Sequence, residues 1–347
     1  MSHHVLTHDN IFQRKVPLWI VFAATGLVAA SFLFARLSEV KITPPVLNPQ
    51  ASSIDCNTII RQQRMKEKKF TSKLLFVETN IESDHLNDLK ASVELLIDKQ
   101  KSQGMISSAS VYLRRFGNTQ WMSVNPDEAF YTASLIKVAV LITILKMSED
   151  NPGWLDKLYP YRREDSRIAS QTFADKTIIP GEDYKIRELL FYMIVYSDNN
   201  ASSILHRLMD KTMCIKLFSD IGIDGFNPDD QYRKLKASDA GKLFRLLYNS
   251  SYLSDVNSEY ALSLLAQSTF KDGLVKELPP GVTVAHKFGE GGTQLENQLC
   301  EAGIVYAVDA PYLIVVMTRG KQLAELSQSI SGISKDVYDF MNAKKGS

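Results

Sequence analysis

The segments of this chain that are typical of β-strands lie at the two ends of one compact region, and helical segments fill its middle. Residues 107–114 and 119–124 have strand character on either side of a Gly-Asn turn, which predicts a hairpin. Strand-like runs return only near the C-terminal end, at residues 283–287, 303–308 and 312–318. Because antiparallel strands from remote parts of a chain can share one sheet, this order predicts an α+β fold.

Apolar residues at helical spacing predict the helical part of that fold. They recur three or four residues apart in residues 85–101, ahead of the hairpin. A second, strongly apolar helix begins near Ser134, and several more are expected from residue 187 to about residue 265. The predicted architecture is therefore an antiparallel sheet built from both ends of the domain, with an inserted all-helical block.

An uncharged run of twenty residues, 16–35, stands near the N-terminus. Its length suits an α-helix that crosses the roughly 30 Å hydrocarbon core of a bilayer. We expect a transmembrane signal anchor there, after a short tail of residues 1–15. Basic residues flank the run on both sides, so charge alone does not set its orientation. The remainder of the chain is expected at the cell membrane on the periplasmic or extracellular side. A cleaved signal peptide is the alternative, although its core is usually shorter.

The residues that follow the run differ in composition from the rest of the chain. Residues 36–72 combine prolines and small polar residues with a basic stretch, which predicts an exposed linker. The basic stretch, residues 61–69, is interpreted as a solvated helix face, with a contact to anionic lipid as the alternative. The folded domain is expected over residues 73–343, as a monomer.

Charge and cysteine content exclude several classes of function. The formal net charge of +1 provides no basic footprint for nucleic acid. The three cysteines, Cys56, Cys214 and Cys300, lack metal-ligand spacing. We interpret Cys214 and Cys300 as small buried hydrophobic residues. No metal, cofactor or nucleic-acid partner is therefore expected.

Ser134 and Lys137 form a Ser-x-x-Lys pattern at the start of the apolar helix. The pattern alone is weak evidence, because it recurs at residues 38–41 and 268–271. At the first turn of a helix, however, a serine faces the positive end of the helix dipole, which stabilises a developing oxyanion. Lys137 follows on the same helix face, where burial would lower its pKa and let it accept the serine proton. The alternative is a serine N-cap beside an unrelated lysine.

Two further patterns stand later in the chain. A Ser-Asp-Asn sequence at residues 197–199 joins two predicted helices, where it fits a turn with a helix cap. It also fits a proton-relaying serine with an amide-binding asparagine. A Lys-Phe-Gly sequence at residues 287–289 ends a predicted strand. A lysine there would line a cleft beside Ser134, and the glycine would permit close backbone approach. The alternative for this pattern is an ordinary strand end.

In this order, the three patterns resemble the active site of the class A β-lactamase and penicillin-binding-protein superfamily. Residues 125–130 resemble that family's lead-in to the serine, and residues 300–305 resemble its strand entry before the last hairpin. The resemblance covers roughly residues 73–340. It implies a β-lactamase-like fold and a serine acyl-enzyme.

The resemblance also implies catalytic roles. Ser134 would attack the substrate carbonyl, and Lys137 would help to deprotonate it. Ser197 would relay a proton to the leaving nitrogen.

The implied substrate-binding residues are Asn199, Lys287, Gly289 and Glu290. Asn199 would contact the substrate amide, and Lys287 would supply positive charge. The backbone N–H groups of Ser134 and Glu290 would form the oxyanion hole, which typically lowers the barrier by about 3 kcal/mol.

The sequence departs from the family pattern in the loop that clears the acyl-enzyme. Class A β-lactamases carry a glutamate there that positions the hydrolytic water. This chain has no glutamate between Glu188 and Glu259, and the corresponding segment, residues 222–236, is short. Its only acids are Asp224, Asp229 and Asp230, which fit turn chemistry better.

A second departure is Phe288, which stands where the family has Thr or Ser. That hydroxyl helps to hold the substrate carboxylate, and phenylalanine offers no donor. Thr293 is the nearest candidate to replace it.

We therefore expect a serine hydrolase that acts on a small-molecule or peptide substrate, either a β-lactam or a related cell-wall amide. The missing glutamate favours a D-Ala-D-Ala carboxypeptidase or an esterase that releases β-lactams slowly. A non-catalytic module for cell-wall peptides is the alternative from another class, but binding alone needs no serine–lysine pair.

Overall fold

A computed structural model describes residues 59–65, 71–117, 120–166, 172–173, 176–230, 233–293, 295–307 and 310–343. The chain divides into two compact units, Met1–Cys56 and Asn57–Ser347, and every described residue belongs to the second. The predicted transmembrane run, residues 16–35, lies outside the described residues. Within the part of the chain that is described, no helix combines the length and apolar character needed to cross a membrane.

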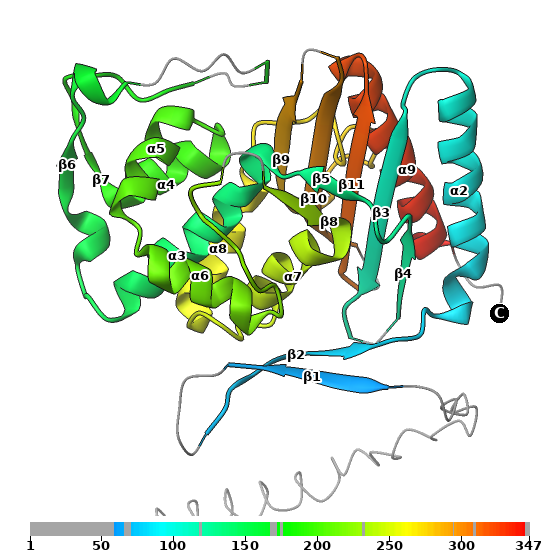
Figure 1. The fold of residues 1–347 in the computed structure, drawn as a ribbon, viewed down its shortest axis with the longest axis horizontal. Coiled ribbons are helices and arrows are strands. Elements are labelled where there is room, and N and C mark those ends of the chain that lie inside the picture. The colour runs from blue at the N-terminus through cyan, green and yellow to red at the C-terminus, as the bar shows by residue number, and fades with distance from the viewer. Residues whose placement is uncertain are drawn as a thin grey trace, which may run out of the picture. The chain divides into compact units, whose positions relative to one another are not determined.

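A five-stranded sheet forms the centre of the second unit, in the order β4-β3-β11-β10-β9 (Figure 1). All of its pairings are antiparallel. The early hairpin β3–β4 thus pairs with late strands through β11, which confirms the predicted sheet from both chain ends. The strands are β3 (Ser108–Arg115), β4 (Trp121–Val124), β9 (Thr283–Gly292), β10 (Asn297–Tyr306) and β11 (Tyr312–Gly320).

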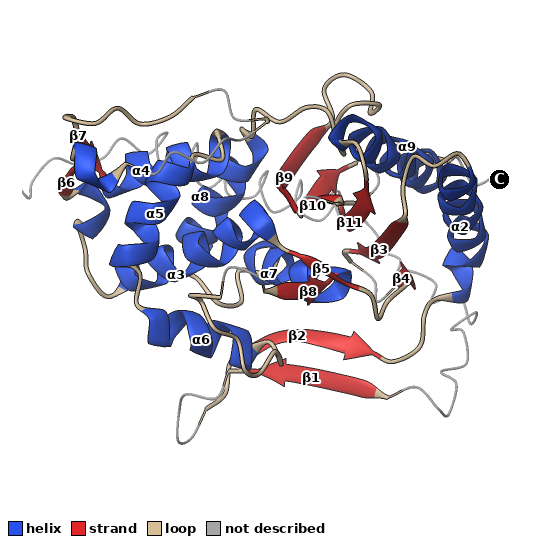
Figure 2. Ribbon diagram, turned by 45° about the horizontal axis from the view of Figure 1, so that its top comes forward, coloured by secondary structure: helices blue, strands red, loops and turns tan. Residues whose placement is uncertain are grey.

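Helices from the two ends of the domain cover one face of the sheet, and the inserted block lies against the other (Figures 1 and 2). The first face carries α2 (Asn87–Ser102) and α9 (Leu323–Asn342), which pack on each other. From the inserted block, α7 contacts β3, β10 and β11, and α8 contacts β9. The block consists of α3 (Lys137–Glu149), α4 (Ile186–Val195), α5 (Asn199–Leu208), α6 (Lys211–Asp220), α7 (Ala237–Tyr248) and α8 (Asp255–Ala266).

The two faces of the sheet build two separate hydrophobic clusters, because successive side chains of a strand point to opposite sides. On β9, Ala285 joins the cluster of the helical block, whereas Val284 and Phe288 join the cluster under α2 and α9. The first nine residues of α3 are all buried, so this helix is surrounded by the block rather than lying on its surface. The helix that follows Ser134 is therefore fixed from every side.

Short strands connect the nucleophile region to the rest of the fold. β5 (Ala129–Tyr131) pairs with β8 (Lys234–Lys236) immediately before the Ser-x-x-Lys segment. The N–H of Thr132 then donates to Arg233 O at 3.3 Å. β6 (Leu158–Pro160) and β7 (Asp183–Lys185) form a second small pair at the far end of the helical block (Figure 1).

Two predicted elements differ from the structure, and one helix was not predicted. The basic stretch interpreted as a helix face contains β1 (Ile60–Arg64), which pairs with β2 (Leu74–Thr79). For residues 61–64 that interpretation is wrong, because they use their backbone groups in a hairpin. Residues 66–69 lie outside the described residues. The strand expected to end at residue 287 continues to Gly292, so the Lys-Phe-Gly pattern lies in mid-strand. The long C-terminal helix α9 was not predicted, although its buried Leu326, Ile330 and Ile333 have helical spacing.

Candidate active site

Ser134 lies in a single 3-10 turn, η2 (Ala133–Ile136), that leads directly into α3. Ala133 has a left-handed backbone with φ of 44°, and Ser134 itself is half-buried. Gly289 of β9 lies against this turn. A Cβ atom at Gly289 would come within 2.5 Å of Thr132 O and 3.0 Å of Ser134 N. The nucleophile turn and β9 can therefore approach this closely only with glycine at position 289.

The side chain of Lys137 is buried at the first position of α3, with 3% of the residue exposed. Its Nζ donates to Asn199 Oδ1 at 2.8 Å, to Ser197 Oγ at 3.3 Å and, in a short bond, to Ser197 O. Burial lowers the pKa of Lys137 to about 7, and the charges of Asp198 and Glu290 partly oppose that shift. A substantial neutral fraction of Lys137 at neutral pH makes it a competent proton acceptor.

Ser197 lies between two buried lysines. Lys287 Nζ donates to Ser197 Oγ at 2.8 Å and to Phe288 O at 2.9 Å, and Lys287 is completely buried. Burial, followed by the charge of Lys137, places the pKa of Lys287 well below its ordinary value. Ser197 adopts a left-handed backbone with φ of 58°, which aims its hydroxyl at this position. One hydroxyl therefore accepts from two amines, and burial lowers the pKa of both.

Asp198 fixes the turn that presents Ser197. Its Oδ1 accepts from Asn200 N and from Thr177 Oγ1, each at 2.9 Å. Its Oδ2 accepts from Ile178 N at 3.0 Å. Asp198 is thus the N-cap of α5 and also ties residues 177–178 to that helix. This confirms the turn with a helix cap that the Ser-Asp-Asn sequence predicted.

The structure brings the predicted site residues together in two groups. Lys137, Ser197, Asn199 and Lys287 form one hydrogen-bonded cluster. Gly289 packs on the Ser134 turn, and Glu290 follows it on β9, paired with Leu299. Because Gly289 packs on the Ser134 turn and Glu290 is the next residue of β9, the backbone N–H groups of Ser134 and Glu290 lie on neighbouring segments. The predicted oxyanion hole requires this arrangement.

The residue that replaces the family's hydroxyl points into the protein core. Phe288 stacks on Phe270 with ring centroids 4.2 Å apart and meets Phe173 edge-on at 5.9 Å. Thr293 does not take over that position. It lies in the exposed turn between β9 and β10, where its Oγ1 accepts from Leu295 N at 3.3 Å.

The acids of the short loop serve local structure, as the sequence indicated. Asp229 is exposed and forms an ion pair with Lys211 at 2.7 Å. Asp224 accepts from Ser219 Oγ at 2.9 Å, and the N–H of Asp230 donates to Asn227 O at 3.3 Å. Asp224 and Asp229 thus make their contacts with α6.

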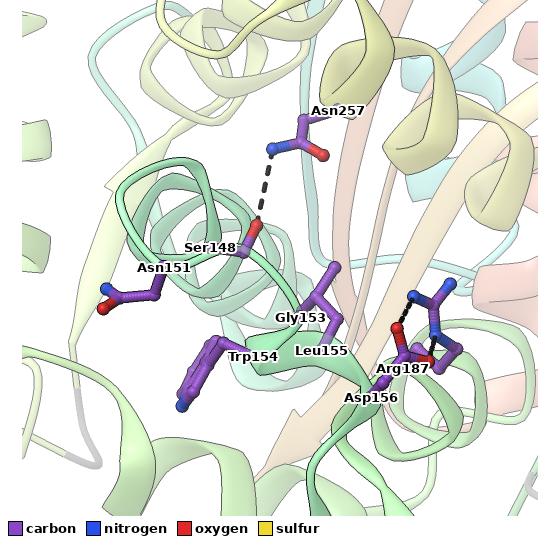
Figure 3. A pocket seen from close by; sticks show the side chains of 8 residues that line it. All are labelled: Ser148, Asn151, Gly153, Trp154, Leu155, Asp156, Arg187 and Asn257. Atoms are coloured by element: carbon purple, nitrogen blue, oxygen red, sulfur yellow. Dashed lines mark hydrogen bonds and ion pairs between the residues drawn. The ribbon is translucent and has the colours of Figure 1, made fainter.

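Other candidate sites are poorer in chemistry. No group of three or more His, Cys, Asp or Glu side chains within the described ranges is placed to hold a metal ion. A pocket of about 170 Å³ on the helical block is lined by Ser148, Trp154 and Asp156, among others (Figure 3). There, Asn257 donates to Ser148 and Arg187 forms a bidentate pair with Asp156, so its polar groups are already paired.

Solved structures of β-lactamases and of a penicillin-binding protein share this fold. A β-lactamase from Chitinophaga pinensis matches with a TM-score of 0.65 and 21% identity, covering 74% of this chain and 100% of its own. The TLA-3 extended-spectrum β-lactamase matches with a TM-score of 0.64 and 18% identity, covering 72% and 98%. A PBP-A variant, solved as an acyl-enzyme complex with penicillin G, matches with a TM-score of 0.60 and 21% identity, covering 73% and 97%.

The fold is therefore that of the serine β-lactamases and their penicillin-binding relatives. Residues 88–341 match the profile of the beta-lactamase enzyme family, and the chain belongs to that family. No curated protein matches the chain at the sequence level.

Proposed function

We propose that this protein is a serine hydrolase that forms an acyl-enzyme at Ser134. The observation that carries the proposal is the pair of buried lysines, Lys137 and Lys287, that share Ser197 Oγ. Burying two amines costs free energy, and a functional role for them would explain that cost. Activation of a serine needs a neutral amine close to the nucleophile.

The geometry suggests a sequence of proton transfers. Neutral Lys137 takes the proton of Ser134 as the serine oxygen attacks the substrate carbonyl. The N–H groups of Ser134 and Glu290 stabilise the resulting oxyanion. As the bond to the leaving group breaks, the Ser197 hydroxyl gives its proton to that group. Ser197 then recovers a proton from Lys137, which returns the lysine to its neutral form.

The proposed substrates are β-lactams or related cell-wall amides. The penicillin G acyl-enzyme of the PBP-A variant shows that the shared fold can support such an adduct in another protein. Phe288 disfavours substrates that rely on a hydroxyl to hold a carboxylate, because its ring is buried among Phe270 and Phe173. Simple esters should therefore react comparatively well. Because the family's deacylating glutamate is missing, a carboxypeptidase or esterase activity is the alternative.

Release of the acyl group should be slow. Hydrolysis of an acyl-enzyme needs a base within hydrogen-bond reach of a water molecule. No glutamate stands between Glu188 and Glu259, and Asp229 is committed to Lys211. We therefore expect a long-lived adduct at Ser134 with little turnover.

Intact-mass spectrometry after exposure to a fluorescent penicillin tests the proposal, together with nitrocefin turnover by the same preparation. A single adduct that persists for many minutes is expected. Asp229→Asn and Asp230→Asn should leave the adduct lifetime unchanged. Fast, multiple-turnover hydrolysis by the wild-type protein would contradict slow deacylation. Failure of both penicillin and simple esters to acylate the protein would favour a non-catalytic peptide-binding module.

We also propose that the protein is attached to the membrane through residues 16–35, with the hydrolase domain outside the cytoplasm. The support is the length of this uncharged run in the sequence. Retention of the full chain in membranes after a carbonate wash is the expected result. A released species that begins near residue 31 or residue 36 would show a cleaved signal instead.

A further inference from the structure

A second cavity lies at the opposite edge of the sheet from the candidate active site. The active site uses β9, whereas this cavity adjoins β3 and the edge strand β4 (Figure 1). Its volume is about 380 Å³, which is enough for a small molecule. Residues of β2, β8 and α7 close its other sides. The residues that line this cavity have no part in the proposed acyl-enzyme chemistry.

The hairpin β3–β4 contributes four polar or aromatic side chains to the cavity. Tyr112 pairs with Ser123 across the hairpin, and Arg114 pairs with Trp121. Because alternate residues of a strand share a side, Tyr112 and Arg114 are neighbours on one face of the sheet. The ring centroids of Tyr112 and Trp121 are 6.2 Å apart. The indole N–H of Trp121 donates to Thr79 Oγ1 at 3.0 Å, which fixes its ring. The two rings thus form an aromatic wall beside a guanidinium group.

Tyr112 and Arg114 are deeply buried, yet some of their polar atoms make no hydrogen bond. Tyr112 is 5% exposed and Arg114 is 7% exposed. Arg114 Nη2 donates to Val77 O at 3.0 Å, but its Nε and Nη1 have no partner among the described residues. The Tyr112 hydroxyl has no partner in the described ranges either. None of these atoms is sealed from solvent, so they open into the cavity. A ligand that accepts hydrogen bonds would satisfy them.

The positive charge of Arg114 is not balanced by an acid. Every other charged side chain that lines the cavity forms an ion pair: Glu78 with Arg245, Glu82 with Lys90, Asp127 with Lys236, and Lys242 with Asp239. Arg114 forms no ion pair with any described residue. Arg245 lies close to it, because both guanidinium groups donate to Val77 O. A buried cation without a counter-charge costs free energy, and an anionic ligand would offset that cost.

We propose that this cavity binds a small molecule that carries a single carboxylate on a ring. The carboxylate accepts hydrogen bonds from Arg114 and from the Tyr112 hydroxyl, since a guanidinium matches the planar carboxylate geometry. The ring of the ligand packs against Tyr112 and Trp121. A doubly charged phosphate fits less well, because Glu78 and Glu82 also line the cavity and repel it. Aromatic acids and sugar acids share the required chemistry.

Isothermal titration calorimetry of the full-length protein tests the ligand class. The probes are benzoate, with benzamide as its neutral counterpart, glucuronate, with glucose as its neutral counterpart, and phenyl phosphate. At least one of the two acids should bind with a Kd of about 1 mM or below, and at least tenfold more tightly than its neutral counterpart. Binding of benzoate alone supports an aromatic acid, and binding of glucuronate alone supports a sugar acid. Tighter binding of phenyl phosphate, or failure of both acids to bind, would contradict the proposal.

Two variants locate the binding of the acid. Arg114→Gln removes the charge but retains an N–H donor for Val77 O, and it should weaken binding at least tenfold. Tyr112→Phe removes only the hydroxyl and should weaken binding about threefold. Arg115→Gln is the matched control, because Arg115 is the next residue of β3 and does not line the cavity. It should leave the affinity unchanged.

Two further results would overturn the proposal. If Arg114→Gln and Tyr112→Phe both bind the acid as tightly as the wild type, the cavity is not the binding site. If Lys287→Met abolishes binding, the acid occupies the cleft beside Ser134 instead. Thermal unfolding curves show whether each variant is folded. Tyr112→Phe deletes a single oxygen atom, so it tests the cavity even if Arg114→Gln does not fold.

Discussion

The two sides of β9 differ in chemistry. On one side, Lys287 and Gly289 face the Ser134 turn and the helical block. Lys287 contributes a buried amine, and Gly289 presents its backbone without a side chain. On the other, His286 and Phe288 face the cluster under α9. His286 Nδ1 lies 2.6 Å from Glu301 Oε1, and both side chains are completely buried.

In the proposed hydrolase, one strand would support both catalysis and stability. Because side chains alternate at every residue, chemistry can occupy one side while packing occupies the other. The side facing Ser134 contains the buried amine of Lys287, and burying this titratable group costs free energy. The opposite side carries stacked aromatic rings and a buried hydrogen bond between His286 and Glu301. Changes on the first side should therefore affect the rate of acylation, and changes on the second should affect the free energy of unfolding.

Removing the nucleophile is expected to have the largest effect. Ser134→Ala should abolish covalent labelling by a serine-reactive probe, a loss of at least a thousandfold, because Ser134 carries the one hydroxyl of η2, Ala133–Ile136. Ser268→Ala is the control, since Ser268 also begins a Ser-x-x-Lys pattern but is buried beyond α8. Gel fluorescence and intact mass measure the labelling. Full labelling of the Ser134→Ala protein would show that Ser134 is not the nucleophile.

Phe288→Ala should lower the free energy of unfolding by about 3–5 kcal/mol, the usual cost of deleting a buried aromatic ring. The ring loses its stacking on Phe270 and its edge contact with Phe173. Lys287→Met, on the opposite side, should greatly slow acylation without a comparable loss of stability. Chemical denaturation followed by circular dichroism gives both unfolding energies. An equal loss of stability in the two variants would contradict the division of β9 into two sides.

Gly289→Ala should slow acylation about a hundredfold, because its Cβ would collide with Thr132 O and Leu135 N and displace the nucleophile turn. Gly291→Ala is the matched control on the same side of the strand. There the added atom would meet only Ala133 Cβ, at 3.3 Å. A stopped-flow ester assay compares the two variants. The close approach has no catalytic importance if both react at the same rate.

The smallest effect concerns pH. Lys137 must be neutral to accept a proton, and burial lowers its pKa to about 7. Below pH 7 the lysine is increasingly protonated, so the acylation rate should fall about tenfold per pH unit between pH 6 and pH 5. Above pH 7 the rate should level off. Pulsed acylation by a neutral ester, quantified by intact mass, gives the profile. A rate that keeps rising to pH 10 would show an ordinary lysine pKa.

Short-range patterns in the sequence predicted the parts of the fold that depend on them. The hairpin, the helix after Ser134 and the late strands follow from spacing and turn residues, and the structure contains all of them. The extent of β9 could not be predicted, because Gly289, Gly291 and Gly292 disfavour a strand by local propensity. Ten ladder positions shared with β10 override that propensity.

The sequence predicted which residues form the site, but it did not predict how their side chains contact one another. The three patterns identified Lys137, Ser197 and Lys287, but not that one hydroxyl would contact both amines. That contact depends on the left-handed backbone of Ser197 and on the pairing of β9 with β10, which involve residues far apart in the chain. The absence of a hydroxyl at Phe288 was visible in the sequence, whereas its aromatic partners Phe173 and Phe270 were not.

The sheet that joins both ends of the domain also determines when the enzyme can first act. Ser134, Ser197 and Lys287 come from three segments separated by 60 residues or more, and the third is on a strand near the C-terminal end of the domain. A chain in which β9 has not yet docked has a serine and a lysine but neither the second amine nor the close backbone at Gly289. Partly folded or truncated chains should therefore be inert toward esters and β-lactams. Acylation of Ser134 can then serve as a direct measure of how many molecules have completed folding.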